Sequence, residues 1–307
     1  MYSVLYKILS PLISLITAIS AAFAPATSLP LVPVNPNPIP DETISQSVTV
    51  MTFNIKSGGD DELSPENRKP LVRETVMKYT ADSFGVQEAD KAWIDLLADA
   101  MPEYAHVGKF RDDGVETGES STIFYLKDKY ELVGSGDFWL SETPDIPSKG
   151  WDAPTHNRIC TYVILKDKET GFTYAHFNTH LDNAGEQARA ESVALIASKI
   201  AQIAPDIPVV LTGDFNFNET SYNYGNMLTC GMKDTKYLAE AADFGPTYHG
   251  YRAVNLDILP IDFVFVNAYV KSVAFSKIDR SKVNGIYPSD HYPVIVNMTL
   301  FNAGGEK

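Results

Sequence analysis

The sequence predicts a single α/β sandwich, in which two β-sheets pack face to face and helices cover their outer sides. Stretches rich in β-branched and aromatic residues, which are typical of strands, recur along the chain and outnumber the helical stretches. The helical stretches occur one at a time between strands, and neither a repeat nor an internal change of composition divides the chain. The 307 residues, of which 44% are hydrophobic, are enough for one large domain.

The first half of the expected domain combines strands with two helices. Residues 47–55 alternate in the manner of a strand. Ser64 followed by Pro65 gives a helix its N-cap and its first residue. Residues 91–101 form a second helix that places Trp93 and Leu97 on one face. The remaining expected elements of this half are strands at 83–87, 104–110, 122–126 and 132–140, and loops at 112–119 and 145–157.

The second half repeats this alternation of strands and single helices. Residues 158–165 and 172–180 read as a hairpin whose turn is 168–171. Residues 184–203 have the apolar spacing of a helix, and the apolar run that begins at Pro208 reads as a buried strand. The remaining expected elements are short helical pieces at 222–230 and 233–242 and strands at 261–266, 270–278 and 294–300.

The start of the chain resembles a targeting segment rather than part of the domain. Lys7 is the only charged residue of 1–26, an apolar stretch covers 8–24, and Ala24-Pro25-Ala26 resembles a signal-peptide cleavage site. The alternative is an uncleaved membrane anchor at 8–24. Residues 27–45 are rich in proline and form a linker, and the folded domain is expected at 46–302. The protein is therefore expected to be secreted or otherwise extracytoplasmic.

The net charge of −14 argues against a broad basic surface that grips duplex DNA. It does not exclude a nuclease, because a bound divalent cation supplies positive charge locally. The only two cysteines, Cys160 and Cys230, do not form a metal motif, and a bridge between them is allowed by an oxidising compartment but is not required.

Polar residues of the kinds used in catalysis lie at or just beyond the ends of several predicted strands. The stretch 208–218, P-V-V-L-T-G-D-F-N-F-N, delivers Asp214 and Asn216 directly after a buried strand. Motifs of zincin proteases, P-loop nucleotide triphosphatases and G-x-S-x-G hydrolases do not occur in the sequence. The whole set at strand ends is Asn54, Glu88, His180, Asp182, Asp214, Asn216, Asp262, Asp290 and His291.

Six short segments occur in order along the chain: T-F-N-I-K (52–56), Q-E (87–88), N-T-H-L-D (178–182), G-D-F-N (213–216), I-D-F-V-F-V (261–266) and S-D-H-Y-P-V (289–294). Taken together, they resemble the endonuclease/exonuclease/phosphatase superfamily, whose fold is that of DNase I. Each motif is weak by itself, but their order and their places at strand ends are specific, and they cover about 47–300. The resemblance implies a four-layered α/β sandwich, with two packed, mostly antiparallel sheets flanked by helices.

The resemblance also implies a Mg²⁺ (or Mn²⁺) site and a hydrolytic water. Glu88 corresponds to the principal metal ligand, with Asn54 and Asp290 beside it. Asp214 and Asn216 correspond to the residues that position and activate the attacking water. These assignments agree with the preference of hard divalent cations for oxygen ligands and with the need of phosphoester hydrolysis for in-line attack.

Two histidines complete the catalytic set that the resemblance implies. His291, oriented by Asp262, would contact the scissile phosphate as a base or an electrostatic stabiliser. His180 would be the second imidazole on the phosphate and a candidate acid for the leaving group. Glu119, which precedes an apolar strand, occupies the place of a glutamate that orients this second histidine in DNase-like members.

Several other polar residues have two interpretations, one structural and one functional. Arg158 begins a strand and either contacts substrate or forms a structural ion pair, and His249 lies in a loop with a possible substrate contact. Asp182 either joins the site or caps the helix that follows it. Trp151 and Tyr248 are candidates for lining a substrate cleft.

The function expected from the sequence is metal-dependent hydrolysis of phosphate esters by a monomer that needs no obligate protein partner. Diesters and monoesters are both compatible, as are small molecules, lipid head groups and nucleic acid as substrates. An extracellular nuclease is one specific alternative. A catalytically inactive binding module is the alternative from another class, although Glu88, Asp214, Asp262 and Asp290 are all present.

Overall fold

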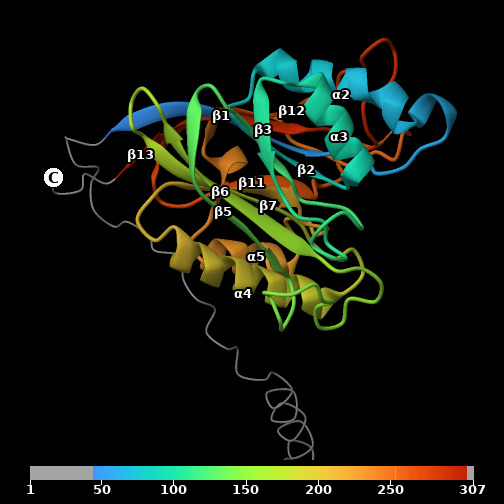
Figure 1. Cartoon of the computed structure of the whole chain (residues 1–307). Coiled ribbons are helices and arrows are strands. Elements are labelled where there is room, and N and C mark those ends of the chain that lie inside the picture. Colours follow the sequence, from blue (N-terminus) through green and yellow to red (C-terminus); the bar gives the residue numbers. More distant parts are fainter. Residues whose placement is uncertain (1–43, 253, 303–307) are drawn as a thin grey trace, which may run out of the picture.

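The protein folds as two packed β-sheets with helices on both outer sides (Figure 1). The structure is a computed structural model that describes residues 44–252 and 254–302. The targeting segment expected at 1–26 and most of the linker expected at 27–45 lie outside the described residues. Within the described part of the chain, no helix is both long enough and apolar enough to cross a membrane.

The first sheet has seven strands in the order β10-β12-β13-β1-β2-β4-β3. The central strands β1 and β2 run parallel, and β13 pairs antiparallel with the other side of β1. The strands of this sheet are β1 (Ser45–Asn54), β2 (Ser83–Gln87), β3 (Tyr104–Val107), β4 (Ile123–Leu126), β10 (Ala239–Ala242), β12 (Val270–Ile278) and β13 (Val294–Phe301).

The second sheet has six strands in the order β5-β6-β7-β8-β11-β9. Its centre is the parallel pair β7 and β8, and β11 pairs antiparallel with β8. The strands are β5 (Tyr130–Trp139), β6 (Ile159–Asp167), β7 (Thr173–His180), β8 (Val209–Asp214), β9 (Lys233–Asp234) and β11 (Asp262–Val266).

The helices make the two outer layers (Figure 1). Helices α2 (Pro65–Tyr79) and α3 (Lys91–Ala100) pack on the outer face of the first sheet. Helices α4 (Glu186–Ile203) and α5 (Tyr222–Thr229) pack on the second sheet. Two short 3₁₀ turns, η1 (Asp61–Leu63) and η2 (Thr235–Tyr237), complete the described helical elements. The predicted four-layered α/β sandwich with mostly antiparallel sheets is therefore confirmed.

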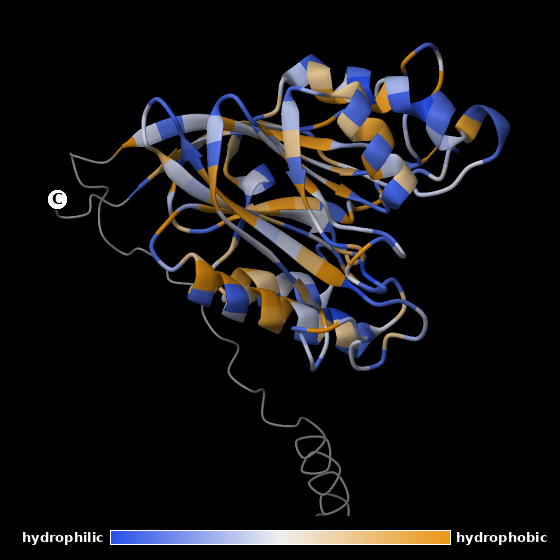
Figure 2. Cartoon of the chain, in the orientation of Figure 1, coloured by the Kyte–Doolittle hydropathy of each residue, from blue (hydrophilic) through white to orange (hydrophobic). Residues whose placement is uncertain are grey.

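Apolar residues fill the three interfaces between these four layers. The central interface joins the two sheets through residues such as Val50 of β1, Val210 of β8 and Val264 of β11. In Figure 2 the hydrophobic colour runs mainly along the strands between the two helix layers, whereas the peripheral loops are mostly hydrophilic. Burial of this surface supplies the main stabilising free energy of the fold. Cys160 and Cys230 are both buried and free.

The expectation of a helical piece at 233–242 was wrong. The structure forms β9, the 3₁₀ turn η2 and β10 there, so that both sheets gain a short edge strand. Asp234 explains the local geometry, because its side chain accepts a hydrogen bond from the Lys236 amide and so caps η2 after one turn. The alanines that suggested a helix instead pair with β12, since tertiary pairing overrides a weak intrinsic propensity.

His176 lies at the interface between the sheets and links them. Its Nδ1 lies 2.8 Å from the Ser83 hydroxyl of β2, and its Nε2 lies 2.8 Å from the Thr212 hydroxyl of β8. The side chain is fully buried, and burial lowers its pKa to about 3. His176 therefore stays neutral in the folded protein and becomes charged more easily in the unfolded chain.

We expect His176→Gln to reduce the sensitivity of folding to acid. A folded-state pKa below the unfolded value gives stability that is present above about pH 6.5 and is lost as pH falls toward the folded value. Between pH 6.5 and 4.5 this group should contribute a loss of about 2 kcal/mol in the free energy of unfolding. Urea unfolding at both pH values measures the difference. A variant with the same pH dependence as the wild type would contradict the expectation.

Candidate active site

The carboxyl ends of two parallel strand pairs, β1/β2 and β7/β8, meet at one edge of the sandwich. Asn54 ends β1, Glu88 directly follows β2, His180 ends β7 and Asp214 ends β8. Asp262 begins β11 directly opposite Asp214, and β7 and β8 place His180 in register with Asp214. Side chains that are far apart in the sequence are thereby brought to the floor of one cavity of about 430 Å³.

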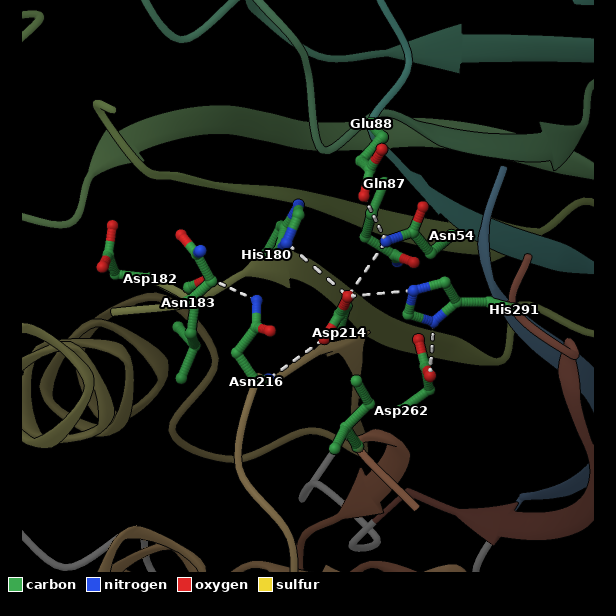
Figure 3. A network of polar contacts seen from close by, with 12 residues as sticks. Asn54, Gln87, Glu88, His180, Asp182, Asn183, Asp214, Asn216, Asp262 and His291 are labelled. Atoms are coloured by element: carbon green, nitrogen blue, oxygen red, sulfur yellow. Dashed lines mark hydrogen bonds and ion pairs between the residues drawn. The ribbon is translucent and has the colours of Figure 1, made fainter. Parts of the chain in front are cut away.

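Asp214 is the centre of this group (Figure 3). Its Oδ2 accepts a hydrogen bond of 2.9 Å from Asn54 Nδ2 and lies 3.6 Å from His180 Nε2 and 3.8 Å from His291 Nε2. Its Oδ1 accepts a hydrogen bond of 3.0 Å from the backbone amide of Asn216. Burial, together with the negative charge of Asp262, raises the pKa of Asp214 to about 7. A carboxylate with a pKa near 7 is well matched to accept a proton at neutral pH.

His291 and Asp262 form a buried pair beside Asp214. The distance from His291 Nδ1 to Asp262 Oδ2 is 2.9 Å. Burial opposes the charged imidazolium, but the carboxylates of Asp262, Asp214 and Asp290 outweigh it and raise the pKa of His291 to about 10. His291 is therefore cationic at neutral pH, with Nδ1 held by Asp262 and Nε2 directed toward Asp214.

His180 has the opposite electrostatic environment. Burial, followed by the positive charges of Arg158 and Arg111, lowers its pKa well below the ordinary value. The imidazole is therefore neutral at pH 7. Its Nδ1 is buried and has no hydrogen-bond partner within the described part of the chain.

Glu88 lies at the other side of Asp214, next to Asn54. Asn54 Nδ2 donates to Glu88 Oε1 over 3.0 Å, and the Ser57 amide donates to Glu88 Oε2 over 3.2 Å. Burial alone would raise the pKa of Glu88, but these hydrogen bonds leave it lowered. Glu88 and Asn216 have φ values of 60° and 50°, in the left-handed region. Such backbone strain at non-glycine residues is concentrated at functional sites.

A buried arginine of α2 supports the loop beside Glu88. Arg68 is fully buried and donates hydrogen bonds of 2.8 Å to the carbonyl oxygens of Lys56 and Gly58. The same loop provides the Ser57 amide that binds Glu88. Arg68 thus fixes the backbone that orients the Glu88 carboxylate.

Comparison with known proteins identifies the family. The model of the endonuclease/exonuclease/phosphatase family matches residues 51–291, which include all the site residues described above. The chain belongs to this family. The sequence resemblance is therefore confirmed, and phosphoester hydrolysis is the chemistry that the family carries out.

Several solved structures and one viral protein are similar to this member of the endonuclease/exonuclease/phosphatase family. An endonuclease/exonuclease/phosphatase from Bacteroides vulgatus is 36% identical, with a TM-score of 0.79, and the match covers 83% of this chain and 99% of that one. A mannosyl-6-phosphatase from Bacteroides thetaiotaomicron VPI-5482 is 34% identical, with a TM-score of 0.76 and coverage of 82% and 99%. An uncharacterized protein of Acanthamoeba polyphaga mimivirus is 29% identical over 247 residues, or 75% of this chain and 91% of that protein.

The structure brings most of the predicted site residues of this family member together, but not all. Asn54, Glu88, His180, Asp214, Asn216, Asp290 and His291 converge as expected, with Asp262 behind His291. Glu119 lines the same cavity, but its carboxylate pairs with Arg111 Nη1 at 2.5 Å, and the expected contact with His180 is not formed. The position of Glu119 just before a predicted strand did not indicate that Arg111 would compete for its carboxylate.

His249 does not face the cavity. It is buried and its ring stacks on Tyr292, with a centroid distance of 4.2 Å, while Tyr287 lies on its other side at 4.5 Å. The preceding residue, Tyr248, lines the cavity instead. The substrate contact expected of His249 is therefore not supported by its position.

Asp182 binds the backbone at the start of a helix, which is the structural one of the two roles predicted for it. Its Oδ1 accepts hydrogen bonds from the amides of Ala184 and Gly185, just before α4. Its Oδ2 lies 3.5 Å from Arg158 Nε. Arg158 lines the cavity and is thus held at the site by Asp182. Trp151 does not line this cavity.

Sequence reasoning missed two cationic residues that line the cavity. Lys56 Nζ lies 3.5 Å from Asp290 Oδ2, and Arg111 pairs with Glu119. Lys56 lies within the T-F-N-I-K motif, and Arg111 directly precedes the loop predicted at 112–119. The clustering of Arg111 with acidic residues up to Glu119 was the available signal.

The donor set of the site fits a hard divalent cation. Glu88 and Asp290 expose carboxylates to the cavity. Asn54 lies beside Glu88 and directs its Nδ2 at that carboxylate, while its side-chain oxygen accepts a hydrogen bond from the Lys56 amide. Lys56 Nζ beside Asp290 shows that a cation is accommodated at this carboxylate. Both carboxylates offer oxygen atoms, which Mg²⁺ and Mn²⁺ prefer.

Another group with metal-ligand potential consists of Asp214, Asp262 and His291, whose ligand atoms lie within 4.8 Å of one another. His291 Nδ1 is already hydrogen-bonded to Asp262, so this group is better arranged to hold and transfer a proton. The cavity therefore contains two acidic clusters. Glu88 and Asp290 offer oxygen atoms that suit a cation, whereas Asp214, Asp262 and His291 are arranged in a way that suits proton transfer.

Proposed function

We propose that this protein is a secreted, divalent-metal-dependent phosphoesterase in which Asp214 activates the attacking water. The observation that carries the proposal is the position of Asp214, whose carboxylate lies between a neutral imidazole, a cationic imidazole and the Glu88–Asn54 pair. The apolar segment at 8–24, with its small residues at 24–26, supports export.

Residues of this chain carry out the proton transfers and the positioning that hydrolysis requires. Asp214 accepts a proton from a water molecule, whose oxygen forms a bond to phosphorus as the ester P–O bond breaks. Asn216 positions this water. Its backbone amide donates a hydrogen bond to Asp214 Oδ1, and its Nδ2 donates one of 3.0 Å to the Leu181 carbonyl. The cationic His291 stabilises the charge on the phosphate and can donate its Nε2 proton to the departing alkoxide. His180, which is neutral, is better suited to hydrogen bonding than to donating a proton.

Glu88, Asp290 and Asn54 would hold a Mg²⁺ or Mn²⁺ ion at the opposite side of Asp214. When bound, such an ion neutralises charge on the phosphate and makes a nearby water more acidic. The proposed Glu88 role is consistent with its lowered pKa, because the carboxylate stays ionised at neutral pH.

The substrate is proposed to be a phosphate ester of a small molecule. The cavity of about 430 Å³ is lined on several sides by charged residues, including Lys56, Arg111 and Arg158, and it has the size of a small-molecule site. The similarity to a mannosyl-6-phosphatase supports a sugar phosphate. An extracellular nuclease has less support, because the net charge is −14.

Hydrolysis of p-nitrophenyl phosphate and bis-p-nitrophenyl phosphate, with Mg²⁺ or Mn²⁺ and with EDTA, tests the proposal. We expect turnover of at least one ester with the metal and at least about a hundredfold loss in EDTA that added metal restores. Activity that survives EDTA would overturn metal dependence. The absence of turnover with every divalent metal would favour an inactive binding module. A panel of sugar phosphates, DNA and RNA then identifies the substrate class.

A further inference from the structure

Two buried arginines form one wall of the active-site cavity. Arg111 precedes the loop at 112–119, and Arg158 directly precedes β6. Only 9% of the Arg111 side chain and 6% of the Arg158 side chain are exposed. Both line the cavity together with His180. Burying two like charges side by side costs free energy unless an anion or hydrogen-bond acceptors compensate them.

The acidic neighbours satisfy only part of each guanidinium group. Arg111 Nη1 pairs with Glu119, and Arg158 pairs with Asp182 through Nε and with Asn183 through Nη2. Within the described residues, Arg158 Nη1 and Arg111 Nε are buried and have no hydrogen-bond partner, although Asp112 Oδ1 lies 4.0 Å from Arg111 Nε. Nδ1 of the nearby His180 is also buried without a partner. An unsatisfied buried polar atom costs free energy. Arg111, Arg158 and His180 all line the active-site cavity and also border a neighbouring void of about 10 Å³.

This wall adjoins the reacting centre. His180 Nε2 lies 3.6 Å from the Asp214 carboxylate. A phosphate attacked by water at Asp214 would therefore present at least one unesterified oxygen to His180, Arg158 and Arg111. Guanidinium groups bind phosphate oxygens well because their planar donors match the geometry of the anion.

We propose that Arg111 and Arg158 form a phosphate-binding fork that selects phosphomonoesters over phosphodiesters. Resting on the proposed function, this inference names the class of substrate. A monoester presents three terminal oxygens and a double negative charge to the fork, whereas a diester presents two and a single charge. The second ester group of a diester would occupy the place of a terminal oxygen and leave buried guanidinium donors unpaired. Sites that hydrogen-bond a substrate group discriminate strongly against analogues that lack it.

Glu119 and Asp182 act as positioning residues for the fork. Each carboxylate occupies one edge of its arginine and leaves another edge free. Asp182 is itself fixed by two backbone amides before α4, so that Arg158 is held by the fold and not by the ligand. A fork arranged in advance loses less entropy on binding.

The test compares monoester and diester hydrolysis in Arg158→Met and Arg111→Met. For each variant, kcat/KM is measured with p-nitrophenyl phosphate and with bis-p-nitrophenyl phosphate at saturating Mg²⁺. We expect the monoester value to fall about 10- to 100-fold, as for loss of a charge-assisted hydrogen bond, and the diester value to change less than about threefold. Equal losses with both esters, or an unchanged monoester value in a folded variant, would overturn the proposal.

Two controls separate this result from a defect in folding. Arg73→Met removes an exposed arginine from α2 and should leave both kcat/KM values unchanged. Arg158→Lys keeps the charge but lacks the planar fork, so its monoester value should fall between those of the wild type and Arg158→Met. If Arg158→Met does not fold, Arg158→Lys is the variant that tests the proposal. A kcat/KM for the monoester equal to that of the wild type would then count against the fork.

A binding measurement distinguishes failure of the fork from failure of the proposed function. Calorimetric titration of the wild type with inorganic phosphate in EDTA depends on neither metal nor turnover. We expect binding that weakens about tenfold or more in Arg111→Met or Arg158→Met and is unchanged in Arg73→Met. Arginine-dependent binding without turnover would support the fork and overturn the proposed function. Absence of phosphate binding to the wild type would overturn the fork even if the protein is a phosphoesterase.

Discussion

Asp214→Asn should lower kcat for phosphoester hydrolysis by at least about a hundredfold, the usual scale for loss of a general base. An amide cannot accept the proton of the attacking water, although it has nearly the shape of the carboxylate. Asp214 is buried, and its carboxylate lies close enough to Asp262 for their charges to repel. The substitution removes that repulsion, which offsets the cost of placing an amide nitrogen against one of the two donors, Asn54 Nδ2 or the Asn216 amide, that bind this carboxylate. We therefore expect the melting temperature to fall only slightly and the protein to stay folded. Steady-state kinetics and thermal unfolding of the same preparation measure both effects.

Asp206→Asn provides the matched control, because Asp206 is exposed and lies outside the cavity. It should change neither kcat nor the melting temperature. If Asp214→Asn folds normally and retains the kcat of the wild type, Asp214 is not the base and the proposed mechanism is wrong. Loss of activity together with unfolding would be inconsistent with the expected stability and would require another substitution, Asp214→Ser, to separate the effects.

Glu88→Gln should raise the Mg²⁺ concentration needed for half-maximal activity by at least about tenfold. At a fixed Mg²⁺ concentration, turnover should fall by about a hundredfold, because a neutral amide is a weaker ligand for a hard cation. Asn54 and Ser57 already donate hydrogen bonds to this carboxylate, and the amide nitrogen of a glutamine would clash with one of them. Mg²⁺ titrations of activity, and Mn²⁺ titrations by calorimetry without substrate, measure the loss.

Glu66→Gln is the control for this substitution, since Glu66 is exposed in the first turn of α2 and lies outside the cavity. Its metal dependence should equal that of the wild type. A Glu88→Gln variant that binds Mn²⁺ with unchanged affinity would place the metal elsewhere, with the Asp214, Asp262 and His291 group as the next candidate.

The sequence predicted the layers well because periodicity and burial are local properties. The strands at 47–55, 83–87 and 294–300 alternate or are apolar throughout, and the structure forms β1, β2 and β13 at these places. The prediction for the segment 233–242 was wrong because the structure of this segment depends on distant residues. Its alanines favour a helix weakly, and pairing with β12 was a non-local interaction that the sequence did not reveal.

Within the site, residues in motifs at or near strand ends could be predicted, whereas the roles of Glu119 and His249 could not. Asp214 ends β8 and Glu88 directly follows β2, so the places of these strands in the sheets fix their direction. Glu119 and His249 were assigned by position, but their neighbours decided their roles. Arg111 forms an ion pair with the Glu119 carboxylate, and the rings of Tyr287 and Tyr292 pack against His249. Such partners come from other parts of the chain, so spacing along the sequence gives no information about them.

The active site crosses the boundary between two separately hydrogen-bonded sheets. Asn54 belongs to the first sheet and Asp214 to the second, and the 2.9 Å hydrogen bond between them spans the interface. Only side chains join the two halves of the catalytic group, so a slight slippage of one sheet over the other would separate them while every strand stayed intact. Turnover therefore reports how the sheets are aligned, and low concentrations of urea should abolish it before circular dichroism detects any loss of secondary structure.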